Sequence, residues 1–263
     1  MRVTRGLITA ALGAGALVAA IAAPASAASV STRSAALTPV SEPGWAGYYT
    51  NDVEVQAATT FVVPRIDCSG NPAGSFAGQA LGVTFLSNYN GTTGPGYGPN
   101  SVVREYCVGH TAYYDTEFYF SNSAGTNEVA IPAGVPVRPG DVVETSVHVT
   151  ASESVDTLVN LGAGRRGFAQ RTGPGATDAA PNLGLIAVSG TATGPNEIGS
   201  PADSSPPAPS NRVVFFGNQI GNQPLSDAAG LGAEEWTDPS NASVVWAAPS
   251  ALAGESFTLT VTP

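Results

Sequence analysis

The chain has 263 residues, of which only 11% are charged, and its 20 acidic and 10 basic residues give a net charge of −10. It contains no lysine, so it lacks the clustered positive charge on which nucleic-acid binding depends. Val, Thr, Ser, Gly and Pro are frequent where a helical bundle would carry Leu, Glu and Lys, and this predicts an acidic, all-β protein.

Residues 1–27 have the features of an export signal. Arg2 and Arg5 precede an apolar run from Leu7 to Ala23, and the small residues 25–27 (Ala-Ser-Ala) match a cleavage site. A transmembrane helix is the alternative, but the run is at the short end of the length that spans a bilayer. We therefore expect a secreted, extracellular protein that has no membrane attachment after cleavage.

The remaining chain divides into a leader and one domain. Residues 28–42 are rich in Ser, Ala and Thr without periodicity, so we expect a flexible leader or a short propeptide. Residues 43–263 are expected to form a single domain, with residues 191–210, dense in Pro, Gly and Ser, as a long surface loop.

Short strand-like runs recur along this domain, separated by clusters of Gly, Pro and Asn. Such a pattern predicts an antiparallel β-sandwich or barrel. The runs are Val53–Val63, Ala80–Leu86, Ser101–Val108, Thr111–Ser121, Val142–Thr150, Thr157–Leu161, Leu185–Val188, Val213–Phe216, Ala242–Trp246 and Ser256–Val261.

The two cysteines, Cys68 and Cys107, are predicted to form a disulfide, because an even count in an exported protein indicates pairing. The alternative is a pair of buried free thiols. His110 and His148 are too few to complete a metal site with them. We expect neither a metal nor a cofactor.

The run from Thr111 to Phe120 alternates in polarity and so predicts a strand with two different faces. One face is apolar and belongs to the core; it carries Ala112, Tyr114, Phe118 and Phe120. The other face carries Tyr113, Asp115, Glu117 and Tyr119. Tyrosines interleaved with carboxylates predict a substrate-binding surface formed by Tyr113, Asp115 and Tyr119, although a solvated sheet face would show the same pattern.

A second carboxylate is expected to join this surface. If the run Ser101–Val108 pairs with Thr111–Phe120 as a hairpin around Gly109, Glu105 and Glu117 can face the same side. Two neighbouring carboxylates that share a proton can activate water at acid pH. The pattern therefore predicts Glu105 and Glu117 as a catalytic dyad.

Several segments, in order along the chain, resemble the eqolisins, or glutamic peptidases. The resemblance is carried by Trp45-Ala46-Gly47-Tyr48-Tyr49, Val53–Pro64, Gln79-Ala80-Leu81-Gly82-Val83, Tyr113–Phe120, Pro139-Gly140-Asp141 with Val147-His148-Val149, and the C-terminal stretch from Pro249 to Thr260. It implies a secreted, acid-active endopeptidase built as an antiparallel β-sandwich resembling the concanavalin A fold.

The resemblance also implies a catalytic Gln–Glu pair, and here the sequence departs from the family. Glu105 stands where the family has its Gln. The family's Glu has two positional counterparts: the run 211–218, which contains no acid, and the run 233–238, which would offer Asp238.

Three functions follow from these observations. The first is an acid endopeptidase that uses Glu105 and Glu117, the second a peptidase-like protein that binds polypeptides without cutting them, and the third a carbohydrate-active sandwich, since glycoside hydrolysis also needs two carboxylates. The expected partner is a polypeptide, and the expected state is a monomer.

Overall fold

Strands make up nearly all of the regular structure in the computed structural model. The model describes residues 32–33, 37–40, 45–50, 56–87, 96–120, 129–150, 153–172, 181–189, 210–238 and 240–262, and residues 31–263 form one unit. The predicted signal, residues 1–27, lies outside the described residues, as does the predicted loop 191–210 except for Ser210. Within the described residues no helix is long and apolar enough to cross a membrane.

Each of the ten predicted runs overlaps one strand, and the described residues contain eight further strands. They are β1 (Thr32–Arg33), β2 (Leu37–Val40), β3 (Trp45–Thr50), β4 (Gln56–Val62), β5 (Phe76–Ser87), β6 (Gly96–Val108), β7 (Thr111–Phe120), β8 (Val129–Pro132), β9 (Val142–Val149), β10 (Glu153–Asn160), β11 (Arg165–Thr172), β12 (Pro181–Ser189), β13 (Asn211–Ile220), β14 (Gln223–Pro224), β15 (Leu231–Asp238), β16 (Asn241–Pro249), β17 (Leu252–Ala253) and β18 (Phe257–Val261). A single 3₁₀ turn, Leu225–Asp227, is the one helical element among the described residues.

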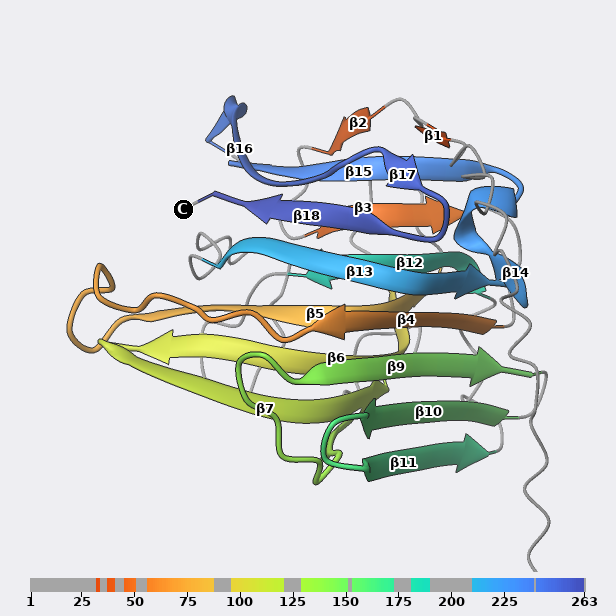
Figure 1. Ribbon diagram of the computed structural model, residues 1–263, viewed down its shortest axis with the longest axis horizontal. Coiled ribbons are helices and arrows are strands. Elements are labelled where there is room, and N and C mark those ends of the chain that lie inside the picture. Colours follow the sequence, from red (N-terminus) through yellow and green to blue (C-terminus); the bar gives the residue numbers. More distant parts are fainter. Residues whose placement is uncertain are drawn as a thin grey trace, which may run out of the picture. The chain divides into compact units, whose positions relative to one another are not determined.

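The strands form a sandwich in which one hydrogen-bonded path folds back on itself. The first layer has the order β11-β10-β9-β4-β13-β18, and β16 connects it to a second layer of order β15-β3-β12-β5-β6-β7-β8. In Figure 1, β4 and β9 lie in front of β5 and β6. The predicted all-β, antiparallel sandwich is confirmed.

The hydrophobic core fills the space between the two layers. Alternate residues of β9 and β10 are buried, as expected for strands with one covered face. The core includes Phe61 and Phe215 from the first layer and Leu81, Val103 and Phe118 from the second. Burying each of these side chains contributes roughly 1.5–3 kcal/mol, so this core fixes which face of each strand points inward.

Gly82 allows strands β5 and β6 to approach closely. It has a φ of +151°, and a Cβ at this position would lie 2.2 Å from the backbone oxygen of Ser101. No larger residue fits there without moving one of the strands.

Eight of the described strands lie outside the ten predicted runs: β1, β2, β3, β8, β11, β14, β15 and β17. The segment expected to be a flexible leader contributes β1, which pairs with β17, and β2, which runs parallel to β15. β15, the first strand of the second layer, was absent from the predicted runs because its buried residues do not alternate. Backbone pairing with neighbouring strands is a tertiary effect that local periodicity does not report.

Candidate functional site

The β6–β7 hairpin places its two predicted catalytic glutamates on opposite faces. Glu105 lies opposite Tyr114, and Glu117 lies opposite Val102. Side chains of directly opposite residues point to the same face, and successive residues alternate. The predicted Glu105–Glu117 dyad is therefore wrong, because the hairpin register separates the two carboxylates by the thickness of the sheet.

Glu105 points into the space between the two layers. Its residue is 0% exposed, and Gln79 on β5, its direct neighbour across the strands, is 4% exposed. The Gln79 Nε2 donates hydrogen bonds to Glu105 Oε1 and, at 3.0 Å, to the Oγ of Ser210. The second carboxylate oxygen, Oε2, has no hydrogen-bond partner in the described structure.

This environment raises the pKa of Glu105 to about 8, because burial disfavours the charged form more than the Gln79 amide favours it. Glu105 is consequently neutral at acid pH. Gln79 and Glu105 together reproduce the residue types of a Gln–Glu pair, but a buried pair of this kind cannot contact a polypeptide on the protein surface.

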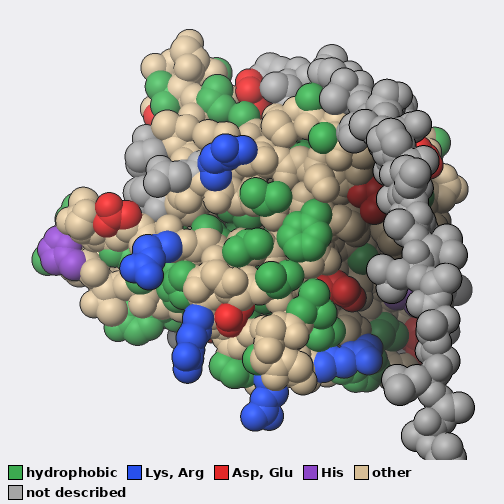
Figure 2. All heavy atoms as spheres, viewed as in Figure 1, with side chains coloured by type: hydrophobic (Ala, Val, Ile, Leu, Met, Phe, Trp, Pro, Cys, Tyr) green, Lys and Arg blue, Asp and Glu red, His purple; other side chains and the backbone are tan. Residues whose placement is uncertain are grey.

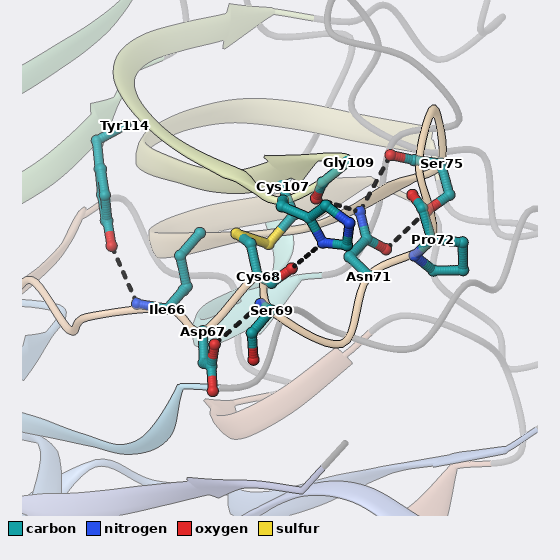
Figure 3. Close-up of a disulfide and its surroundings, with 11 residues drawn as sticks. Ile66, Asp67, Cys68, Ser69, Asn71, Pro72, Ser75, Cys107, Gly109 and Tyr114 are labelled. Carbon is teal, nitrogen blue, oxygen red and sulfur yellow. Dashed lines mark hydrogen bonds between the residues drawn. A yellow bond between two sulfur atoms is a disulfide. The ribbon is translucent and has the colours of Figure 1, made fainter.

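The disulfide predicted between Cys68 and Cys107 is present and lies on the same inner side of β6. Its Cα atoms are 5.6 Å apart, and it links the segment that follows β4 to the end of β6 (Figure 3). Beside it, the backbone N–H of Ile66 donates to the hydroxyl of Tyr114 at 3.0 Å. Both contacts fix the segment that follows β4 against the hairpin.

The other face of the hairpin, which we call the outer face, carries an ion-pair cluster. Arg104 on β6 donates from Nη1 to Glu117 Oε1 at 2.7 Å, and its Nε lies 3.7 Å from Asp115 Oδ1. The side chains of Arg104 and Glu117 are 5% and 13% exposed, whereas that of Asp115 is 38% exposed. Asp115 is thus the part of this cluster most accessible to a ligand.

Burial raises the pKa of Asp115 above its ordinary value. The Arg104 guanidinium and the Tyr106 hydroxyl act in the opposite direction, while the negative charge of Glu117 adds to the increase. Arg104 therefore contacts two carboxylates on one face, and the pKa of one of them, Asp115, is raised.

Three aromatic rings stand in a row beside this cluster. Phe76 on β5 stacks on Tyr106 with ring centroids 5.3 Å apart, and Tyr106 stacks on Tyr113 at 5.4 Å. Arg104 completes the arrangement with its guanidinium carbon 5.2 Å from the centre of the Tyr106 ring. Tyr113, 45% exposed, ends the row.

The predicted site residues are thus divided. Tyr113, Asp115 and Glu117 share one face, as their alternation predicted, whereas Glu105 lies on the other face. The side chain of Tyr119 lies outside the described part of the structure. Sequence reasoning missed Arg104 and Gln79, and a correct hairpin register would have placed Arg104 directly opposite Asp115.

Asp238, the other acid considered, is far from this cluster. It ends β15, which is separated from β7 by β3, β12, β5 and β6, so five strand spacings amount to roughly 24 Å. Its Oδ1 accepts hydrogen bonds from the backbone N–H and the hydroxyl of Ser240, which lowers its pKa. These contacts stabilise the turn between β15 and β16, and Asp238 does not supply a third acid to the outer face.

Comparison with solved structures relates the fold to one group of enzymes. No protein-family model and no curated protein matches the sequence. Scytalido-glutamic peptidase with a transition-state analog inhibitor superposes with a TM-score of 0.61 at 16% identity, covering 84% of this chain and 99% of the enzyme. SCP-B, a member of the eqolisin family solved with the tripeptide Ala-Ile-His, gives 0.57 at 16% identity, with 84% of this chain and 99% of that chain covered. Aspergilloglutamic peptidase from Aspergillus niger gives 0.52 at 15% identity, covering 71% of this chain and 99% of that chain. The chain has the β-sandwich fold of the glutamic peptidases.

Proposed function

We propose that this protein is exported and binds extended polypeptides on the outer face of β5, β6 and β7, without the Gln–Glu chemistry of the glutamic peptidases. The observation that carries the proposal is the position of the two glutamates: Glu105 is enclosed between the layers and Glu117 is held by Arg104. Polypeptide is the ligand class because two similar structures contain peptidic molecules, the tripeptide Ala-Ile-His and a peptide-based transition state analog.

Water activation requires a carboxylate that reaches a water molecule next to the scissile bond. Glu105 does not reach the surface, and Glu117 Oε1 is occupied by a guanidinium nitrogen at 2.7 Å. The Arg104 guanidinium thus occupies the Glu117 oxygen that would otherwise be able to contact a water molecule. These contacts favour binding over hydrolysis.

A second function, acid endopeptidase activity, is favoured by one observation. Asp115, with its raised pKa, and Glu117 lie two residues apart on the same face of β7. Acid–base catalysis needs one protonated and one ionised carboxyl group, and Arg104 could stabilise an oxyanion next to them. The same pair would serve a carbohydrate-active protein, which a panel of glycans tests.

The experiment compares binding and turnover in the exported protein. Anisotropy with labelled random hexapeptides measures binding, and digestion of denatured casein from pH 3 to pH 8 measures hydrolysis. Glu144→Gln is the matched control, because Glu144 is an exposed carboxylate on β9 in the other layer.

Peptide binding without casein cleavage, weakened in Glu117→Gln and unchanged in Glu144→Gln, supports the proposal. Cleavage at pH 3–5 that is lost in Asp115→Asn and Glu117→Gln supports the endopeptidase instead. Absence of both binding and cleavage overturns both functions. N-terminal sequencing of the exported protein tests secretion, with Ala28 expected as the first residue.

A further inference from the structure

We infer that the outer face recognises a cationic side chain, arginine or lysine, of the bound polypeptide, which would stack on Tyr113 and pair with Asp115. The inference rests on the proposed function, because it specifies the ligand of the same face. It follows from the charge balance, the aromatic row and the way in which the protein holds its own Arg104.

The charge balance leaves one negative charge for a ligand. A single guanidinium, that of Arg104, faces two carboxylates, and it is closer to Glu117, at 2.7 Å, than to Asp115, at 3.7 Å. Asp115 is also the more exposed of the two: its side chain is 38% exposed, and because its Oδ1 is buried beside Arg104, a ligand would approach the other carboxylate oxygen. An incoming cation would therefore pair with Asp115.

The ring of Tyr113 offers a surface for the same cation. One side of this ring stacks on Tyr106, and the ring is 45% exposed. On the side of β7 away from β6, β8 pairs with Glu117–Phe120, and the next residue after β8 adds a backbone hydrogen bond from Ala133 N–H to the oxygen of Thr116. The part of β7 that carries Tyr113 is thus a strand edge, where an extended polypeptide could lie alongside.

The protein's own arginine shows that this chemistry works on this face. Arg104 lies over the Tyr106 ring, with 5.2 Å from its guanidinium carbon to the ring centre, and pairs with the carboxylates of β7. Tyr113 is the direct cross-strand partner of Tyr106, and Asp115 is the direct cross-strand partner of Arg104. A ligand cation stacked on Tyr113 would repeat on β7 the contact that Arg104 makes with Tyr106 on β6.

The aromatic row stands on a rigid support. The Asn71 side-chain amide donates to the backbone oxygens of Ser75 and Gly109, at 3.1 and 3.0 Å, and so ties the segment before β5 to the hairpin turn (Figure 3). The Cys68–Cys107 disulfide adds a covalent link next to Tyr106. A ligand that binds here would not have to order the rings first, which lowers the cost of binding.

The outward-facing side of the first layer provides control residues for these experiments. Figure 2 shows the side of the first layer, where basic side chains stand singly among polar and hydrophobic ones. Exposed residues on that layer provide controls for the outer face: Glu144 as a carboxylate and Phe168, 55% exposed on β11, as an aromatic ring.

The test uses two peptides that differ in the charge of one side chain but have nearly the same shape. Two fluorescein-labelled peptides, Ala-Ile-Ala-Arg-Ala-Ile and the same peptide with citrulline in place of arginine, are titrated with the full exported protein and followed by anisotropy. We expect the arginine peptide to bind about tenfold more tightly. Asp115→Asn should reduce this preference to twofold or less, and Tyr113→Leu should reduce it severalfold. Glu144→Gln and Phe168→Leu should leave it unchanged.

Three outcomes would overturn the inference. Equal binding of both peptides by the wild type rejects cation recognition while leaving polypeptide binding in place. A preference that survives in Asp115→Asn assigns it to the overall negative charge of the protein instead of this site. Binding of neither peptide, nor of random hexapeptides, rejects the proposed function itself. Circular dichroism of each variant establishes that the fold is retained.

Discussion

The two glutamates of the β6–β7 hairpin have the same side chain and opposite surroundings. Glu105 is enclosed between the layers with the amide of Gln79, whereas Glu117 lies on the outer face with the guanidinium of Arg104. The difference comes from the tight turn after Val108, which pairs odd-numbered residues of β6 with even-numbered residues of β7. A change of one residue in the turn would have brought both carboxylates to one face. In a sandwich of this kind, register decides which acids can cooperate.

The largest expected effect is a loss of stability as the pH rises, because of Glu105. Its pKa is about 8 in the folded protein and near 4.5 when unfolded, so the folded state holds the proton more tightly. This stabilisation is fully present below pH 4.5 and is lost as the pH rises through 8, on the order of 5 kcal/mol in all. Urea denaturation at pH 4, 6 and 8 measures it.

Glu105→Gln isolates this contribution from that of Asp156, a second buried carboxyl group whose pKa is also raised by burial. The amide keeps the shape and removes the titration, so the variant should be less sensitive to pH and more stable than wild type at pH 8. Glu144→Gln should follow the wild type. If the wild type and Glu105→Gln lost stability in parallel, Glu105 would be solvated.

The disulfide on the inner side should contribute the next largest effect. It closes a loop with a sequence separation of 39, for which loop-closure entropy gives roughly 3–4 kcal/mol. Replacing Cys68 and Cys107 together by Ser should lower the free energy of unfolding by about this amount. Adding a reductant should destabilise the wild type and leave the double variant unaffected; a reductant effect on the double variant would contradict the assignment.

Removing the Arg104 guanidinium from the outer face should lower the free energy of unfolding by about 3 kcal/mol. Arg104→Met leaves Glu117, which is largely buried, without its partner, and breaking a buried pair is costly for that reason. Combining it with Glu117→Gln should recover part of the loss, since the uncompensated charge is then absent. Strictly additive losses in this double-mutant cycle would show that the two side chains do not interact.

The smallest expected effect is at the end of the aromatic row. Tyr113→Ala removes one stacked pair from a half-exposed position and should cost about 1 kcal/mol of stability. Phe168→Ala is the comparison, because Phe168 is exposed and stacks on no other ring in the described residues. Equal losses in thermal unfolding would mean that the stacking of Tyr113 contributes nothing.

Local patterns predicted ten of the described strands and the contents of each face of β7, but not the relation between strands. The alternation from Thr111 to Phe120 placed Phe118 in the core and Asp115 with Glu117, because one strand fixes these relations. The pairing of Glu105 with Gln79 depends on the register of β5 against β6, which no local pattern encodes. Arg104 was overlooked for the same reason, since its partners come from the neighbouring strand.

The burial of Glu105 between the layers, away from Glu117, can be tested directly by NMR measurement of its pKa. Selective ¹³C labelling of glutamate carboxyl groups, followed from pH 3 to pH 10, should show one signal that titrates near pH 8 and is absent from Glu105→Gln. That result would place Glu105 between the layers. If no glutamate titrated above pH 6, or if the signal near pH 8 persisted in Glu105→Gln, the assignment of Glu105 to the interior would be wrong.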